Sequence, residues 1–149
     1  QEVVWILNVI FFYLLNNINA YFIIEEPESH LFPNAQKLIA EFISLGKNEG
    51  KNQIFITTHS PYILGEINNL LYANRISAFA DKDGLDQLIP PNKRLRFSDL
   101  SAYFIKNGQV ISCVDSEFES IENEVIDGAS EDINREFEKM VILKEKFLS

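Results

Sequence analysis

The stretch Tyr21–Pro33 reads YFIIEEPESHLFP, and its order predicts a strand that ends at two adjacent carboxylates. Residues 20–25 (AYFIIE) form a continuous apolar run, which is typical of a central strand covered on both faces of a sheet. Glu25 and Glu26 close that run. Carboxylates at the end of an apolar run are costly unless something uses them. This strand end is therefore the first candidate for a functional site.

The first eighty residues alternate between helical and strand patterns. Helices are expected at 3–15, at 34–48 and from Ser60-Pro61 onward, and strands at 20–25, 53–58 and 75–80. Residues 3–15 are apolar nearly all round, which predicts a deeply buried helix. Ser60 is expected to cap the third helix, with Pro61 at its first position. This order predicts an α/β fold with a parallel sheet and a right-handed crossover between its first two strands.

The middle of the chain predicts a loop followed by a hairpin. Residues 81–84 (DKDG) indicate a turn, and residues 85–100 have two prolines and weak periodicity, which favours loop. Asn107-Gly108 lies between apolar runs at 102–106 and 109–114. Asn-Gly in that setting is the strongest short signal for a β-hairpin.

The last part of the chain is acidic and is expected to be helical. The net charge of the 149 residues is −9, and the span Asp115–Glu138 holds ten acids against one base. Ser116 with Glu119 matches a capping box that opens a helix to about residue 126, and Ser130 is expected to cap a last helix. We expect one domain over residues 1–114, with residues 115–149 as its helical extension.

Composition limits the classes of function. The negative charge argues against a broad nucleic-acid-binding surface. Cys113 is the single cysteine, which excludes an intrachain disulfide and a Cys₄ or Cys₂His₂ zinc site, and we expect it to pack in the core of a cytoplasmic protein. The apolar run 3–15 is too short to span a membrane. The chain begins with Gln1, so we expect a fragment of a longer protein.

Three interpretations fit the strand end, of which two are chemical and one is structural. Ligands bind at the carboxyl ends of strands in parallel sheets, where Glu25, Glu26 and His59 are expected to converge. For phosphoryl transfer, adjacent carboxylates point differently, so one can face Mg²⁺ and the other a water. A bare metal site of a nuclease would use Glu25 with Glu28 and His30. A purely structural strand edge with a capped turn is the third interpretation.

Two motifs resemble one family of ATPases. YFIIEEPESHLFP resembles the Walker B and D-loop segment of ABC-type ATPases, and ITTHSP (residues 56–61) resembles their switch-histidine loop. The pair is most similar to the branch that contains OLD-family and RecF-like proteins and stand-alone bacterial AAA-type ATPases. Many members of that branch act in DNA repair or phage defence.

The resemblance implies a role for each matching residue. Glu25 corresponds to the acid that holds Mg²⁺ through water, although an aspartate is commoner there in transporter ATPases. Glu26 corresponds to the general base, and His59 to the histidine that senses the γ-phosphate of ATP. Gln1 resembles the end of the signature motif and would contact nucleotide. Ser29-His30-Leu31 falls on the D-loop, which crosses a homodimer interface in the family.

The chain departs from the family in one large respect. No G-x-x-x-x-G-K-[ST] motif occurs, so the loop that cradles phosphates and its lysine are missing. The resemblance therefore implies the C-terminal half of an ABC-type P-loop NTPase domain, mainly over residues 1–80, that hydrolyses ATP only in an intact protein. Any DNA contact would come from regions outside this chain. The rival interpretation is an interaction module without enzymatic activity.

Other residues favour structural roles. Trp5 and the aromatic residues after it have no basic residues between them, which favours helix packing over a nucleic-acid platform. The one basic cluster consists of Lys93, Arg94 and Arg96. It could contact DNA phosphates, but we favour a solvated loop.

Overall fold

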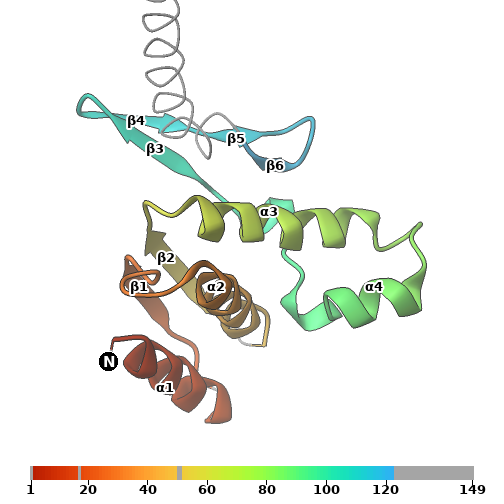
Figure 1. The fold of residues 1–149 in the computed structure, drawn as a ribbon, viewed down its shortest axis with the longest axis horizontal. Helices are drawn as coiled ribbons and strands as arrows, with labels where there is room; N and C mark the ends of the chain where they lie inside the picture. The colour runs from red at the N-terminus through yellow and green to blue at the C-terminus, as the bar shows by residue number, and fades with distance from the viewer. Residues whose placement is uncertain (1, 17, 50–51, 123–149) are drawn as a thin grey trace, which may run out of the picture.

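The computed structural model describes residues 2–16, 18–49 and 52–122. It has a mixed α/β fold, with helices packed on a parallel strand pair and two hairpins beyond them (Figure 1). The helices are α1 (Glu2–Leu15), α2 (Pro33–Asn48), α3 (Pro61–Ile76) and α4 (Lys82–Leu88), with short 3₁₀ helices η1 (Pro91–Lys93) and η2 (Phe97–Asp99). The strands are β1 (Tyr21–Glu25), β2 (Gln53–Thr57), β3 (Tyr103–Lys106), β4 (Gln109–Ser112), β5 (Val114–Asp115) and β6 (Ser120–Ile121).

The strand pair β1–β2 is parallel, as the sequence predicts. The register runs from Tyr21 opposite Gln53 to Glu25 opposite Thr57, and α2 makes the connection. Both strands therefore end at the same edge. The predicted helices over 3–15 and 34–48 are confirmed within a residue or two of their expected ends.

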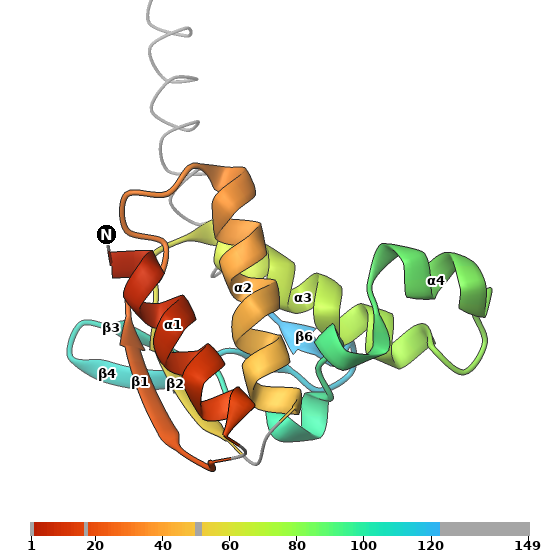
Figure 2. The same ribbon diagram turned by 90° about the horizontal axis from the view of Figure 1, so that it is seen from below.

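One face of this sheet packs against helices. Ile24 and the inward side chains of both strands contact a core that contains Ile10 of α1, Ile39 and Ile43 of α2, and Ile63 of α3. Figure 2 shows α1, α2 and α3 beside one another on the same side of β1 and β2. The apolar residues at every second strand position thus bury against three helices, which supplies most of the hydrophobic stabilisation.

Within the described ranges no element covers the opposite face of the sheet, so the prediction of strands covered on both faces is wrong for this part of the chain. Tyr21, Ile23 and Phe55 are 80%, 75% and 61% exposed. The prediction that residues 3–15 form a deeply buried helix is also wrong. Ile10 is 1% exposed, but Trp5 and several other apolar residues of α1 are exposed. An apolar run shows that a strand can be covered on both faces, but the described elements supply only one cover.

The predicted third strand at 75–80 is absent. α3 continues to Ile76, and the amides of Phe79 and Ala80 both donate to the Ile76 carbonyl, which turns the chain. The helical hydrogen-bond ladder thus extends over residues whose side-chain pattern also fits a short strand. The described part of the parallel sheet has two strands.

The predicted turn and loop over 81–100 contain regular structure. Asp81 caps α4 by accepting a hydrogen bond from the Gly84 amide at 2.9 Å. Leu70 and Ala73 of α3 and Ile89 form a second small core. The prolines and weak periodicity hid this structure, because α4 has only two turns and no fully buried residue.

Ion pairs fix this region to α2 and use the basic cluster. Lys93 Nζ lies 2.7 Å from Glu41, and Arg94 lies 2.5 Å from Asp86. Arg96 pairs with Asp99, which also accepts a hydrogen bond from Lys47. Each cation of the cluster therefore faces a carboxylate, and only Arg96, with a side chain that is 69% exposed, is mostly in solvent.

The predicted hairpin is confirmed. β3 and β4 are antiparallel, and Asn107 and Gly108 both have positive φ, +52° and +75°, as a two-residue turn of this hand requires. Cys113, just after β4, is 4% exposed, which confirms its core position. Burial, together with the charge of Glu122, raises the pKa of the Cys113 thiol.

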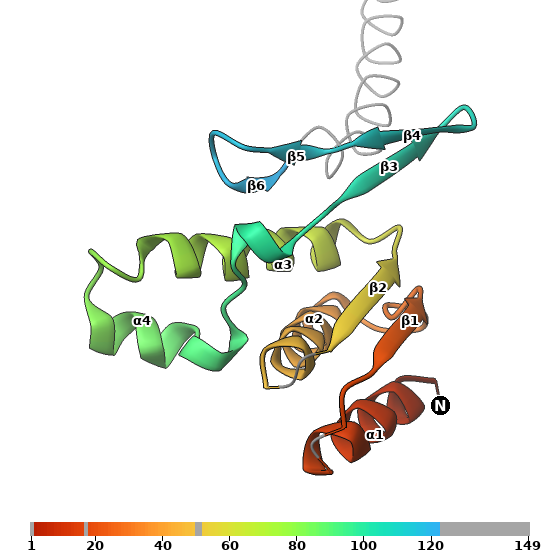
Figure 3. The same cartoon turned by 180° about the vertical axis from the view of Figure 1, so that it is seen from behind.

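A second hairpin replaces the start of the predicted C-terminal helix. β5 and β6 pair across a turn in which the Asp115 side chain accepts hydrogen bonds from two amides. The Asn68 side chain on α3 pairs with the amide and the carbonyl of Ile121, which holds this hairpin on the helix (Figure 3). The rest of that predicted helix and the helix from Ser130 lie outside the described residues. Within the described ranges, no helix has the length and apolar character needed to cross a membrane.

Candidate functional site

The ends of β1 and β2 bring the predicted site residues to one edge. Glu25 lies opposite Thr57 in the register, and the next amide, that of Glu26, donates to the Thr57 carbonyl at 2.8 Å. Glu26 has φ = +44°. This left-handed conformation is unfavourable for a residue with a side chain, and such outliers cluster at functional sites.

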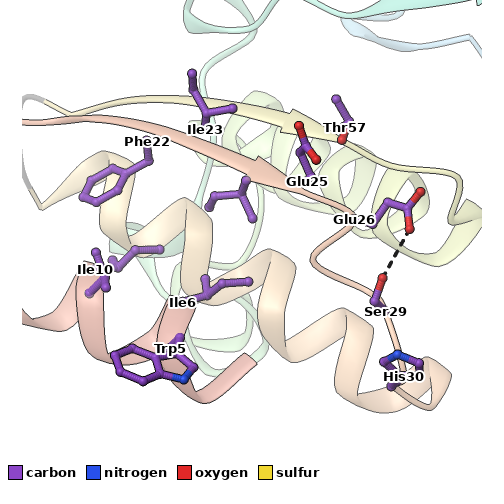
Figure 4. Close-up of a pocket in the computed structure, with 12 residues that line it drawn as sticks. Trp5, Ile6, Ile10, Phe22, Ile23, Glu25, Glu26, Ser29, His30 and Thr57 are labelled. Carbon is purple, nitrogen blue, oxygen red and sulfur yellow. Dashed lines mark hydrogen bonds between the residues drawn. The ribbon is translucent and has the colours of Figure 1, made fainter. Parts of the chain in front are cut away.

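The carboxylate of Glu26 faces the residue predicted to act with it. Its Oε1 lies 3.6 Å from Nε2 of His59, and its Oε2 accepts a hydrogen bond of 3.3 Å from the Ser29 hydroxyl. Figure 4 shows Glu26 directed at Ser29, with Glu25 on the strand before it. The predicted convergence of Glu26 and His59 is therefore present, and Glu25 stands beside them at the strand end.

The first strand-end loop (residues 26–30) is a tight double turn. The Ser29 amide donates to the Glu26 carbonyl, and the Leu31 amide donates to the Glu28 carbonyl, both at 2.9 Å. Pro27 is fully buried, whereas His30, with φ = +64°, is exposed. The loop therefore has a buried anchor and an exposed tip.

Glu28 connects this loop to the second strand-end loop (residues 58–60). One of its carboxylate oxygens, Oε1, accepts hydrogen bonds from the Thr58 hydroxyl at 2.7 Å and from the His59 amide at 2.8 Å. The other oxygen, Oε2, is buried and has no hydrogen-bond partner among the described residues. Sequence reasoning considered Glu28 only as a metal ligand, because spacing along the chain gives no sign of this contact between loops.

The second loop leads into the N-terminus of α3. The Ser60 hydroxyl oxygen accepts hydrogen bonds from the amides of Tyr62 and Ile63, which confirms the predicted cap. The same hydroxyl donates to Oε1 of Gln36 at 2.5 Å, and Gln36 Nε2 donates to the Leu31 carbonyl. Polar contacts thus hold the two loops to each other and to α2.

An open pocket of about 820 Å³ lies beside the first loop. It is apolar along α1 and β1 and polar at the strand end (Figure 4). Its lining comprises Trp5, Ile6, Val9, Ile10, Phe22, Ile23, Ile24, Glu25, Glu26, Ser29, His30 and Thr57. Trp5, which we expected to pack in a buried helix, is 71% exposed on this pocket. The pocket can accept a ligand with an apolar body and a polar end.

The carboxylates fit one kind of metal site better than another. Within the described ranges, no three His, Cys, Asp or Glu side chains gather closely enough to hold a metal ion by themselves. The set proposed for a nuclease, Glu25 with Glu28 and His30, is not assembled, because Glu28 is bonded to the second loop. Glu25 is exposed at the strand end, which suits Mg²⁺, an ion that keeps several waters and takes one or two carboxylates. Gln1 lies outside the described residues.

Part of the chain is similar to a known protein family. The model of the AAA ATPase domain family matches residues 6–64, a range that contains both strand-end loops. That match supports an AAA-type ATPase fragment and nucleotide binding as the class of function. Neither a curated protein nor a solved structure matches the chain.

Proposed function

We propose that this chain is the part of an ABC-type, RecF- or OLD-like ATPase domain that carries the Walker B acids and the switch histidine. In the intact protein, ATP would be hydrolysed with Mg²⁺ between two copies of the domain. The observation that supports this proposal most directly is the distance of 3.6 Å between the Glu26 carboxylate and the His59 ring at neighbouring strand ends. The family match over residues 6–64 supports the same class.

Each residue receives a separate task in this proposal. Glu25 would hold Mg²⁺ through its waters, and the ion, when bound, supplies positive charge beside the phosphates. Glu26 would accept a proton from the attacking water, and Ser29 keeps its carboxylate oriented. His59, whose side chain is 89% exposed, is free to donate a hydrogen bond to a phosphate oxygen. The alternation of strand side chains separates the first two tasks.

This chain lacks one part that ATP hydrolysis requires. The sequence holds no phosphate-cradling loop, and a loop of that kind supplies most backbone contacts to a nucleotide's phosphates. We therefore expect neither sub-millimolar nucleotide binding nor ATPase activity from residues 1–149 alone. Isothermal titration calorimetry with Mg-ATP tests this, and sub-millimolar affinity would contradict it.

The role of Glu26 is tested in the intact protein. Glu26→Gln keeps the size of the side chain and removes the base, so ATP binding should remain while kcat falls about 10²- to 10⁴-fold. Glu117→Gln, on the exposed turn between β5 and β6, is the matched control and should keep normal turnover. Normal turnover of the Glu26 variant would remove the proposed base.

A second candidate is an interaction module that keeps the ATPase scaffold without its chemistry. The exposed apolar face that includes Tyr21, Ile23 and Phe55 favours it. The sequence upstream of Gln1 in the gene separates the two candidates. A phosphate loop with its lysine there supports the ATPase, and its absence favours the module.

The biological setting rests on the family resemblance and composition. We propose a cytoplasmic protein of DNA repair or phage defence, with any DNA contact made by regions outside this chain. We also propose a domain over residues 1–114 with an acidic extension over residues 115–149. The lone buried cysteine is consistent with a reducing compartment.

A further inference from the structure

The His59 ring is almost fully exposed, so little packing within the described part of the chain holds it near Glu26. Its side chain is 89% exposed, and Nε2 of the ring lies 3.6 Å from the Glu26 carboxylate. The backbone of residues 58–60 must therefore set the direction in which the ring points. An exposed side chain on a movable loop would otherwise spread over several rotamers.

Glu28 fixes that backbone. Its Oε1 accepts from both the Thr58 hydroxyl and the His59 amide, and the Ser60 amide donates in turn to the Thr58 hydroxyl at 3.0 Å. Hydrogen bonds to an ionised carboxylate are shorter and stronger than those between neutral groups. The Glu28 carboxylate therefore holds the first half of the second strand-end loop, at Thr58 and His59.

The position of Glu28 is itself rigid. Pro27 before it is fully buried, and the Glu28 carbonyl accepts from the Leu31 amide. Its second oxygen is buried without a partner in the described part of the chain, which is unfavourable for stability alone. The backbone that carries the Glu28 carboxylate is therefore held on both sides.

We propose that Glu28 is a positioning residue that sets the geometry between His59 and Glu26 by holding the second strand-end loop against the first. Its consequence for catalysis rests on the proposed ATPase function, but the contact between the loops does not. Movement of either loop would then change the position of the histidine relative to the base. The substitution of Glu28 should affect turnover and leave nucleotide affinity nearly unchanged.

The structural part is tested by amide hydrogen exchange in the 149-residue chain. Glu28→Ala removes the acceptor, so the His59 amide should exchange about tenfold faster. The Leu95 amide, bonded to the Leu70 carbonyl away from the site, reports the global fold and should not change. Glu28→Gln keeps an acceptor oxygen and should retain the protection of His59.

Glu66→Ala is the matched control for loss of a buried carboxylate. Glu66 is 4% exposed, accepts one hydrogen bond from Asn69 and also has a buried oxygen without a described partner. Its replacement should not change the exchange of the His59 amide. Unchanged exchange of that amide in Glu28→Ala overturns the proposal. If Glu28→Ala does not fold, Glu28→Asp decides, because it keeps a carboxylate on a side chain that is one methylene shorter: faster exchange of the His59 amide supports the proposal, and exchange equal to that of the parent overturns it.

The catalytic part is tested in the intact protein. Glu28→Ala should lower kcat about tenfold or more with KM for ATP within about twofold, and Glu28→Gln should recover most of the rate. Full kcat in Glu28→Ala, with the Glu26→Gln variant inactive, overturns the positioning role and leaves the proposed function standing. Absence of ATP hydrolysis in the unmodified protein refutes the proposed function, and the exchange measurements still decide the contact between the loops.

Discussion

The two faces of the β1–β2 sheet carry similar side chains but have different surroundings. On one face Phe22 and Ile24 contact a core made with three helices. On the other face Ile23 and Phe55 are mostly exposed. Both sets are apolar, because the strands have the continuous apolar runs typical of buried parallel strands.

The two faces therefore differ in what they contribute to the free energy of folding. The covered face holds β1, β2 and the two strand-end loops in place, so it positions the candidate site. The open face contributes little to the stability of this chain, because its side chains remain in water. Substitution of neighbouring residues of the same type on one strand should therefore change the free energy of unfolding by very different amounts.

The largest difference is expected between Ile24→Ala and Ile23→Ala. Ile24 is 7% exposed, and its truncation should lower the free energy of unfolding by about 2–5 kcal/mol. Ile23 is 75% exposed, and its truncation should cost less than about 1 kcal/mol. Both variants lose the same strand propensity, so urea denaturation of the pair isolates burial. Equal losses would show that the open face is covered in solution.

On the covered face of the sheet, α1 and α2 approach each other closely at Gly46. A Cβ at Gly46 of α2 would lie 2.7 Å from Cγ2 of Ile10 in α1, whereas a Cβ at Gly65 of α3 meets nothing within 4 Å. Gly46→Ala should therefore destabilise the chain by about 1–3 kcal/mol through overpacking. Gly65→Ala should stabilise it by about 0.4–1 kcal/mol through backbone entropy. Thermal unfolding measures both, and a stabilising Gly46→Ala would mean that α1 does not pack closely on α2.

The sequence predicted the elements whose signals are local and strong. The apolar runs gave β1 and β2, Asn107-Gly108 gave the turn of the β3–β4 hairpin, and Ser60 gave a helix start. The prediction at 75–80 was wrong because a six-residue apolar pattern fits both a strand and the end of a helix. Whether a face is covered could not be predicted, because that depends on elements distant in the sequence.

The candidate site was predicted in part for the same reason. Parallel strands with consecutive ends are enough to bring Glu26 and His59 together, and the structure places them 3.6 Å apart. The contact from Glu28 to the second loop depends on the conformation of two turns. No spacing rule in the sequence encodes that conformation.

A smaller effect on stability is expected at Ser60, where the second strand-end loop leads into α3. Ser60→Ala removes the acceptor for two amides of α3 and the contact with Gln36, and should lower stability by about 1 kcal/mol. Ser101→Ala, at an exposed position, should change it by less than about 0.5 kcal/mol. Chemical denaturation compares the two variants. Equal effects would mean that the cap does not hold the start of α3.

The smallest effect is expected at the end of α2 farthest from the site, and it depends on pH. The hydrogen bond from Lys47 lowers the pKa of the Asp99 carboxyl below its ordinary value of 3.8; burial opposes that shift, and Arg96 adds to it. A depressed pKa in the folded state stabilises the fold above the ordinary value, and this stabilisation is lost as the pH falls through the folded pKa. Because Asp99 lies in an ion pair at the surface, the contribution at neutral pH should be only about 0.2–1 kcal/mol. Denaturation of the parent and of Asp99→Asn should therefore differ slightly at neutral pH and converge as the pH falls below 3.8 and through the folded pKa of Asp99, with a smaller difference in high salt. A difference that persists at low pH would show that the substitution acts through packing. The ionic contact between Lys47 of α2 and Asp99 of η2 would then contribute nothing to the free energy of unfolding.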